Sequence, residues 1–166
     1  MELWDVYDER GRKQSGTLVR GEPIPRGQYH LVSCVLVQHE NGDYLLLLRS
    51  PQKKVSPNCW EIGTGGSALR GESSEACARR ELLEETGIRA EQLQFLDRLV
   101  EPENGTIYDG YLCVTDQRQS ILQPEETVDY RWVSKEIFLK FFDSDACIPR
   151  IRTRLRPYVD RLRESC

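Results

Sequence analysis

The feature that most constrains this chain is a glycine-rich segment followed at once by an acidic helix. Residues 63–72 read GTGGSALRGE, and helical spacing of apolar and charged side chains follows up to Thr86. Ser73 or Ser74 can cap the start of this helix, because a serine hydroxyl accepts a hydrogen bond from a backbone N–H of the first turn. Gly87 is placed to end the helix in the left-handed conformation. We therefore expect a tight loop that leads into a helix of defined length.

Three carboxylates crowd together on this helix. At about 100° per residue, Glu81, Glu84 and Glu85 share an arc of about 100°, although like charges at these spacings repel by about a few tenths of a kcal/mol per pair. Arg80 precedes Glu84 by four residues and can brace it, which leaves the other two without a cation in the helix. We expect the opposite side of the helix to pack on a sheet through Ala76, Leu82 and Leu83.

Carboxylates placed this closely raise one another's pKa unless a cation lies between them. One interpretation of the helix is a solvated acidic face. The glycine-rich segment favours another, because a glycine backbone can approach a ligand closely. Mg²⁺ takes oxygen ligands from a few carboxylates, with waters and substrate phosphates completing its shell. The arrangement therefore indicates a metal-assisted phosphate site, in which the metal neutralises charge and activates the attacking water.

Composition and charge narrow the class of protein. The chain has 166 residues, of which 39% are hydrophobic and 30% charged, as in a globular domain with a real core. Its net charge of −4 attracts neither nucleic acid nor an anionic membrane surface. No apolar run approaches the roughly 20 residues of a membrane span, and the acidic start MELWDVYDERG is unlike a signal peptide. The six cysteines form no CxxC pair, so we expect reduced thiols in a cytoplasmic protein.

Loop signals divide the chain into an N-terminal hairpin (1–28), a core (29–142) and a C-terminal helix (147–165), all within a single domain. The nearly continuous apolar run at 28–38 predicts a strand covered on both faces, and Asn41-Gly42 predicts a tight turn into the next strand. Further strands are expected at 44–49, 59–62, 92–100, 106–115 and 127–134, and a short helix at 134–142. Because strands and helices alternate irregularly, we expect an α/β fold built as a mixed sandwich.

The glycine-rich segment and its helix resemble the Nudix box, G-x5-E-x7-R-E-U-x-E-E-x-G-U, in which U is aliphatic. The match holds at every fixed position, which here are Gly66, Glu72, Arg80, Glu81, Leu82, Glu84, Glu85, Gly87 and Ile88. The order of elements from residue 29 to 142 also resembles a Nudix domain. The resemblance implies an α/β/α sandwich with a mixed β-sheet. It further implies a Mg²⁺- or Mn²⁺-dependent hydrolase that cleaves the phosphoanhydride bond of a nucleoside diphosphate derivative or a related diphosphate.

The resemblance also implies roles for individual residues. Glu84 and Glu85 would bind the metal together with the backbone carbonyl of Gly65. Glu81 would be a further metal ligand or the general base on the water. Arg80 would belong to the catalytic set by orienting a glutamate.

Two further carboxylates have less defined roles in the resemblance. Glu72 would support the loop or bind a further ion. Family members often take a metal-binding carboxylate from a later loop, six residues or so before a tryptophan. Here that position is Glu126, ahead of Trp132, with Glu125 and Asp129 as alternates. The competing interpretation of Glu126 is an exposed loop acid.

The opening LWDVYDERG, together with YHLV and LRSPQKKVSPNCW, is similar to the Nudix subgroup near isopentenyl-diphosphate isomerase. That enzyme carries a cysteine and a histidine soon after a tryptophan as its protonating pair. Aligned on Trp60, this chain has Gly65 and Ser67 at those places. We therefore expect hydrolysis and keep an isomerase-like protein as the alternative. A catalytically silent binding or regulatory module is a further alternative, although it would have no need of all three glutamates.

Other residues are candidates for substrate contacts. Arg49, Lys53 and Lys54 flank the expected mouth of the site and can hold substrate phosphates, or they can form a solvated basic loop. Trp60 can stack on a base or pack in the core. Six arginines between residues 150 and 163 are typical of a nucleic-acid face, but the apolar stripe of that helix explains it without one. We expect a small phosphorylated substrate and neither a nucleic acid nor a membrane as partner, with the N-terminal hairpin as a candidate homodimer contact.

Overall fold

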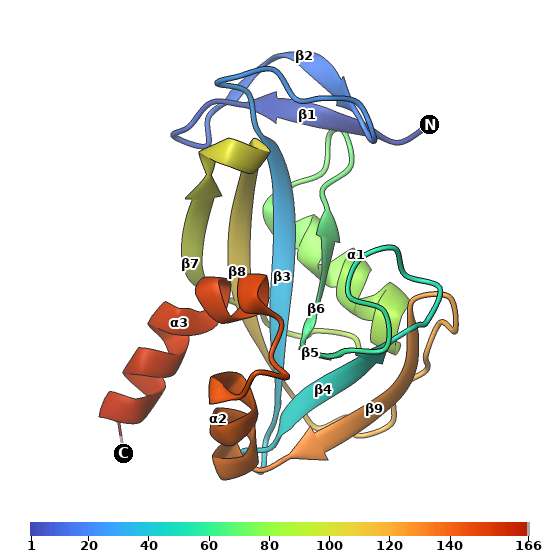
Figure 1. Cartoon of the computed structure of the whole chain (residues 1–166), viewed down its shortest axis with the longest axis vertical. Helices are drawn as coiled ribbons and strands as arrows, with labels where there is room; N and C mark the ends of the chain where they lie inside the picture. Colours follow the sequence, from blue (N-terminus) through green and yellow to red (C-terminus); the bar gives the residue numbers. More distant parts are fainter. Residues whose placement is uncertain (166) are drawn as a thin grey trace.

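A mixed β-sheet forms the centre of the molecule, and helices cover both of its faces (Figure 1). The computed structural model describes residues 1–165. Its elements in chain order are β1 (Leu3–Tyr7), β2 (Lys13–Val19), β3 (His30–His39), β4 (Tyr44–Arg49), β5 (Trp60–Ile62), β6 (Thr64–Ser67), α1 (Ser74–Thr86), β7 (Gln94–Glu101), the 3₁₀ turn η1 (Pro102–Asn104), β8 (Thr106–Thr115), β9 (Thr127–Val133), α2 (Lys135–Asp143) and α3 (Pro149–Glu164).

The main sheet has seven strands in the order β5-β4-β3-β8-β7, with β6 paired to β3 and β9 paired to β4. β3 and β8 run parallel over their whole length, and the other neighbours are antiparallel. The expected mixed sheet and α/β/α sandwich are therefore confirmed.

The central strands are buried on both faces, as the continuous apolar run at 28–38 predicts. On β3, Leu36 joins a core cluster with α2 and α3, while Val35 and Val37 join a second cluster with α1. β4 alternates in the same way, with Leu46 in the first cluster and Leu47 in the second. This alternation follows from the two-residue period of a strand, so neither face can be polar.

The glycine-rich segment differs from the expected loop, because Thr64–Ser67 forms the strand β6. The Asn41-Gly42 turn joins β3 to β4 as predicted, but the two strands keep only one register pair before β4 diverges. β6 takes the vacated edge of β3, with Ser33 opposite Gly66 and Cys34 opposite Gly65. Gly63 makes the bend between β5 and β6 at φ 72°, where a Cβ would clash with the backbone of β3. Glycine is therefore required at the point where the sheet splits.

Helix α1 begins and ends where the sequence indicates. The Ser73 hydroxyl accepts from the N–H of Ala76, and Gly87 adopts the left-handed conformation at φ 72°. The expected packing face is wrong for Ala76 and Leu83, which are exposed. The buried side chains Cys77, Ala78, Leu82, Glu85 and Thr86 span about −40° to +140° relative to Glu81. The carboxylates therefore lie on the sheet side of the helix, and Ala76 and Leu83 face solvent from the opposite side.

The N-terminal hairpin β1–β2 lies over one end of the sheet (Figure 1). Tyr7 exchanges backbone hydrogen bonds with Tyr29 at the start of β3. Asp5 is buried and accepts from the backbone N–H of Gly71 at 2.7 Å and from Lys13 Nζ at 2.7 Å. The hairpin is thereby tied to the loop that precedes α1.

The C-terminal helix α3 packs on the sheet through Ile151 and Val159, with Leu155 and Leu162 partly buried beside them. In residues 1–165, no helix is long and apolar enough to cross a membrane. Five cysteines are free thiols, as predicted, namely Cys34, Cys59, Cys77, Cys113 and Cys147. Cys166 lies outside the described residues.

Candidate active site

A cavity of about 280 Å³ opens between the sheet side of α1, β6 and two loops. It brings together most of the residues that the sequence predicts for a metal site, namely Gly65, Glu81, Glu84, Glu85 and Glu126, with Gly66, Arg80 and Lys53 also in its wall. Because these side chains come from α1, β6 and the loops before β5 and β9, only the folded chain assembles them.

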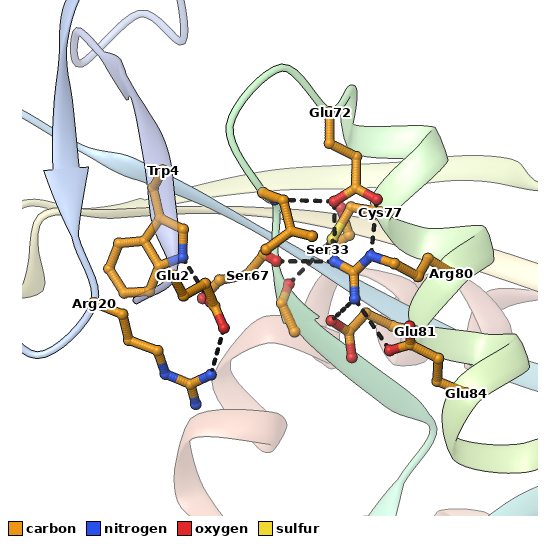
Figure 2. A network of polar contacts seen from close by, with 12 residues as sticks. Glu2, Trp4, Arg20, Ser33, Ser67, Glu72, Cys77, Arg80, Glu81 and Glu84 are labelled. Carbon is orange, nitrogen blue, oxygen red and sulfur yellow. Dashed lines mark hydrogen bonds and ion pairs between the residues drawn. The ribbon is translucent and has the colours of Figure 1, made fainter.

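Arg80 organises the carboxylates at one side of this cavity (Figure 2). Its guanidinium donates Nε to Glu72 Oε1 at 2.8 Å and Nη2 to Glu72 Oε2 at 2.9 Å, a two-point contact of the kind that only arginine makes. Nη1 donates to Glu81 Oε1 at 2.6 Å and to Glu84 Oε2 at 3.2 Å, and Nη2 donates to the carbonyl of Ser67. The expectation that Glu81 has no cation in the helix is therefore wrong, since Arg80 holds three glutamates at once.

Among the carboxylates of this cavity, Glu85 differs because it has no hydrogen-bonded cation in the described residues. The residue is 9% exposed, and its Oε2 is buried with no hydrogen-bond partner among residues 1–165. Burial raises the pKa of Glu85 well above its ordinary value, and the neighbouring carboxylates of Glu61, Glu81 and Glu126 raise it further. A buried, unpartnered acid among like charges is a costly arrangement for a fold alone. It is the arrangement expected of a group that binds a cation.

Glu81 lies deeper than Glu84. Its side chain is 14% exposed, whereas that of Glu84 is 49% exposed. Burial raises the pKa of Glu81, although the hydrogen bond from Arg80 acts in the opposite direction. A raised pKa at a cavity wall suits a group that takes up a proton, so the structure is compatible with either predicted role, ligand or base.

Two glycines let the backbone of β6 approach these side chains. A Cβ on Gly66 would overlap the carboxylate of Glu81, so only glycine leaves room for that carboxylate. A Cβ on Gly65 would lie 2.6 Å from the carbonyl oxygen of Ser33 on β3. Both glycines therefore keep β6 close to β3 and to α1, which places the Gly65 backbone at the cavity wall.

The donor set fits a divalent cation with oxygen ligands. Carboxylates and a backbone carbonyl are the ligands that Mg²⁺ and Mn²⁺ prefer, and the orphaned Oε2 of Glu85 supplies a buried oxygen with a free lone pair. In the described part of the chain, however, no three of these side chains already converge on one point. Arg80 explains why, because it draws Glu81 and Glu84 toward itself. Those carboxylates must turn away from Arg80 before they can share an ion.

The predicted basic residues at the end of β4 and in the loop after it differ in their surroundings. Lys53 lies at the cavity and pairs with Glu126, and Arg49 pairs with Glu61 at 2.8 Å. Lys54 is exposed and does not line this cavity. Trp60 packs against the cluster around α2 and α3, with Arg131 stacked 4.5 Å from its ring centre. The structure therefore does not bring Lys54 or Trp60 to the site.

Three residues near the site carry no prediction from the sequence. Glu61 follows Trp60 in the short strand β5, and burial raises its pKa despite the partner Arg49. An acid inside an otherwise apolar strand was the signal that could have identified it. Glu2 and Arg20 of the N-terminal hairpin pair at 2.8 Å and line the cavity (Figure 2). No local pattern marks them, because their position depends on how the hairpin docks.

The sequence and the fold match proteins of one family. A family model described as NUDIX domain matches residues 28–150. An uncharacterized Nudix hydrolase of Listeria monocytogenes is 35% identical over 156 residues, which cover 90% of this chain and 89% of the relative. The isopentenyl-diphosphate Delta-isomerase of Pectobacterium atrosepticum is 28% identical over 138 residues, covering 78% of this chain and 75% of that enzyme. A solved structure from Deinococcus radiodurans matches with a TM-score of 0.76 at 21% identity, covering 93% of this chain and 98% of that one. The chain therefore belongs to the Nudix hydrolase family, whose general activity is hydrolysis of pyrophosphate bonds.

Proposed function

We propose that this Nudix hydrolase cleaves the phosphoanhydride bond of a nucleoside diphosphate derivative, or of a related diphosphate, and that it needs Mg²⁺ or Mn²⁺. The observation that carries the metal requirement is the buried Oε2 of Glu85, which has no partner among residues 1–165 and lies beside other carboxylates. When bound, a divalent ion neutralises phosphate charge and lowers the pKa of a coordinated water.

The roles within the site follow from burial and hydrogen bonding. Glu84 and Glu85 hold the ion with the carbonyl of Gly65, and Glu126 is the candidate for a further ligand once Lys53 turns to the substrate. Glu81 is the deeper carboxylate beside Arg80 and acts as a ligand or accepts the proton of the attacking water. Arg80 is fixed by Glu72 and orients Glu81 and Glu84 beside the site in the free protein, and a carboxylate that joins the ion turns away from it.

The isomerase alternative has weaker support from the site, although one isomerase is a relative. Gly65 and Ser67 stand where that chemistry needs a protonating cysteine and histidine, and neither side chain can protonate carbon. Cys34 lies across the strand pair from Gly65, but burial raises its pKa, which keeps it a thiol. A silent binding module is disfavoured by the full set of glutamates, because their mutual repulsion serves nothing without a cation.

Hydrolysis of a panel of dinucleotides, nucleotide sugars and prenyl diphosphates tests this function, measured with Mg²⁺ and with EDTA. Because cleavage between two substituted phosphates gives phosphomonoesters, the products are followed directly by chromatography or as phosphate released by an added phosphatase. We expect turnover on at least one diphosphate, abolished by EDTA and by Glu84→Gln combined with Glu85→Gln. Glu75→Gln on the exposed first turn of α1 is the matched control and should retain full turnover. Full turnover in the double variant, or double-bond migration in isopentenyl diphosphate without phosphate release, would contradict the proposal.

A further inference from the structure

A second cavity, of about 320 Å³, lies between α3 and the sheet and adjoins the carboxylate site. Lys53 and Gly65 line both cavities, so a ligand can extend from one into the other. Part of its wall is apolar, with Leu99, Ile151 and Leu155. Two arginines of α3, Arg150 and Arg154, also line this cavity and make part of its wall cationic.

Four of the six arginines of α3 do not line this cavity and have partners elsewhere. Arg152 donates to the carbonyls of Ser144 and Cys147, and Arg156 stacks over the ring of Phe142 at 4.8 Å. The other two pair with carboxylates on the surface, Arg161 with Asp97 and Arg163 with Asp143. These contacts leave no arginine-rich outer face of the kind that nucleic acid would need.

Arg150 and Arg154 differ from the other four, since both line the cavity and neither has a carboxylate within 4.0 Å in the described residues. The Arg154 guanidinium lies 3.4 Å from the ring centre of Tyr108, and its Nε is buried without a hydrogen-bond partner. Arg150 donates Nη1 to the hydroxyl of Ser56 at 3.2 Å. Burial lowers the pKa of Arg150, and the nearby cations Arg49 and Arg154 lower it further, whereas Glu61 acts in the opposite direction. Two poorly solvated cations side by side are costly unless an anion joins them.

Arg150 and Arg154 lie where they can reach a ligand that is held at the carboxylate site. Arg154 Nη1 lies 4.0 Å from Cys34 Sγ, and Cys34 is the register partner of Gly65, whose carbonyl is a predicted metal ligand. In the free protein, the other cations at this junction are paired with carboxylates, Arg49 with Glu61 and Lys53 with Glu126. Arg150 and Arg154 have no such pairing in the described residues, so α3 can supply positive charge to a ligand without breaking an ion pair.

We propose that Arg150 and Arg154 form a phosphate-binding subsite that holds the phosphoryl group of the substrate farther from Glu84 and Glu85. Guanidinium groups suit this task because they donate two parallel hydrogen bonds to phosphate oxygens. The apolar wall formed by Leu99, Ile151 and Leu155 then takes the organic group attached to that phosphate. The assignment rests on the diphosphate chemistry proposed above, but it concerns binding and can be tested without turnover.

The test uses methylenediphosphonate, whose P–C–P bridge cannot be hydrolysed, and orthophosphate as a ligand with a single phosphorus. Both are titrated calorimetrically in the presence of Mg²⁺ into the wild-type chain and into the variant Arg150→Gln with Arg154→Gln. We expect the variant to bind methylenediphosphonate about tenfold or more weakly, because charge-assisted hydrogen bonds are lost. Orthophosphate binding at the carboxylate site should change by less than about twofold. Arg163→Gln, on the surface of the same helix, is the matched control and should bind both ligands as the wild type does.

Thermal unfolding of each variant checks that it is folded. Arg154→Lys keeps the charge but loses the two-point hydrogen bonding of a guanidinium group, so its affinity for methylenediphosphonate should lie between those of the wild type and the double variant. The subsite proposal is wrong if the double variant binds methylenediphosphonate as tightly as the wild type does. It is also wrong if the wild type binds methylenediphosphonate no more tightly than orthophosphate. If methylenediphosphonate binding depends on the two arginines while no diphosphate is hydrolysed, the subsite stands and the proposed hydrolysis fails. If a diphosphate is hydrolysed but methylenediphosphonate binds equally well without the two arginines, the proposed hydrolysis stands and the subsite fails.

Discussion

Replacing Glu85 by glutamine tests whether the buried carboxylate is kept for a cation. Glutamine has nearly the same shape, so the change removes the charge and leaves the packing against the sheet. Glu85 is 9% exposed, and its Oε2 has no partner in the described residues. An unsatisfied buried polar group costs about 1–3 kcal/mol, and more when it is charged. In EDTA at pH 7.5 we therefore expect Glu85→Gln to be more stable than the wild type.

The pH dependence gives the sign of this effect independently. Burial, followed by the carboxylates of Glu61, Glu81 and Glu126, raises the folded-state pKa of Glu85 well above its ordinary value. The folded state therefore holds a proton that the unfolded state releases, and stability contributed by the protonated acid is present at low pH and lost as pH rises through the folded pKa. The wild type without metal should lose stability from about pH 4.5 upward, and Glu85→Gln should lose less over the same range.

Thermal unfolding followed by circular dichroism measures both effects. A gain of 1 kcal/mol corresponds to about 2–4 °C in Tm for a chain of this size, so we expect Glu85→Gln to melt several degrees above the wild type in EDTA. Mg²⁺ should raise the Tm of the wild type by mass action and leave that of Glu85→Gln nearly unchanged. Glu84→Gln is the control for EDTA, because Glu84 is half exposed and its loss should shift stability by less than about 0.5 kcal/mol. A Glu85→Gln variant that melts below the wild type in EDTA, or that keeps the full response to Mg²⁺, would show that the Glu85 carboxylate is not kept for a cation.

Two further substitutions test the surroundings of the site, and a third tests a buried histidine at the start of β3. Gly66→Ala should push the Glu81 carboxylate aside and reduce kcat by about tenfold or more, with little change in Tm. Gly110→Ala is the matched stability control, because a Cβ at that position has room. An unchanged kcat in Gly66→Ala would contradict the close contact between the Gly66 backbone and Glu81. Arg80→Lys keeps the charge but loses the two-point contact, so the free energy of unfolding should fall by about 1–3 kcal/mol and turnover should fall as well. Wild-type stability and turnover would show that the two-point contact is dispensable. Burial lowers the pKa of His30 to about 4 from 6.5, so between these pH values the unfolded state binds a proton that the folded state does not. The free energy of unfolding should therefore fall by about 3 kcal/mol as pH drops from 6.5 to 4. Denaturant unfolding should show a smaller fall for His30→Gln, and an equal fall would exclude His30 as its source.

The local signals in the sequence were reliable where short-range chemistry decides the structure. The serine cap, the left-handed Gly87 and the Asn41-Gly42 turn each depend on a few neighbouring atoms, and all three form as expected. Continuous apolar residues on β3 also predicted burial on both faces. By contrast, pairing of Thr64–Ser67 with β3 depends on β4 moving away first, which no local pattern reports.

The error at α1 has a physical cause. Amphipathic reasoning assigns leucines to the core and glutamates to water, so it turned Leu83 inward. In the structure Leu83 is 38% exposed and Glu85 is 9% exposed. A site that bears charge must lie between elements if it is to enclose a ligand, so its carboxylates follow the buried face. The helix tolerates this because Ala78 and Leu82 flank them and pack on the sheet.

The two adjoining cavities carry charges of opposite sign, and this pairing restricts the ligand more than either cavity alone. Glu81, Glu84 and Glu85 make one end anionic, whereas Arg150 and Arg154 make the other end cationic. A simple anion would satisfy only the arginines, and a bare cation would satisfy only the glutamates. A diphosphate that carries a divalent ion presents positive charge at one end and phosphate oxygens at the other, so it matches both. In the free protein the carboxylates at one end repel one another, and so do the arginines at the other end, because both groups are partly buried away from water. Binding such a ligand relieves both costs together, which is the reason to expect cooperative binding of metal and diphosphate.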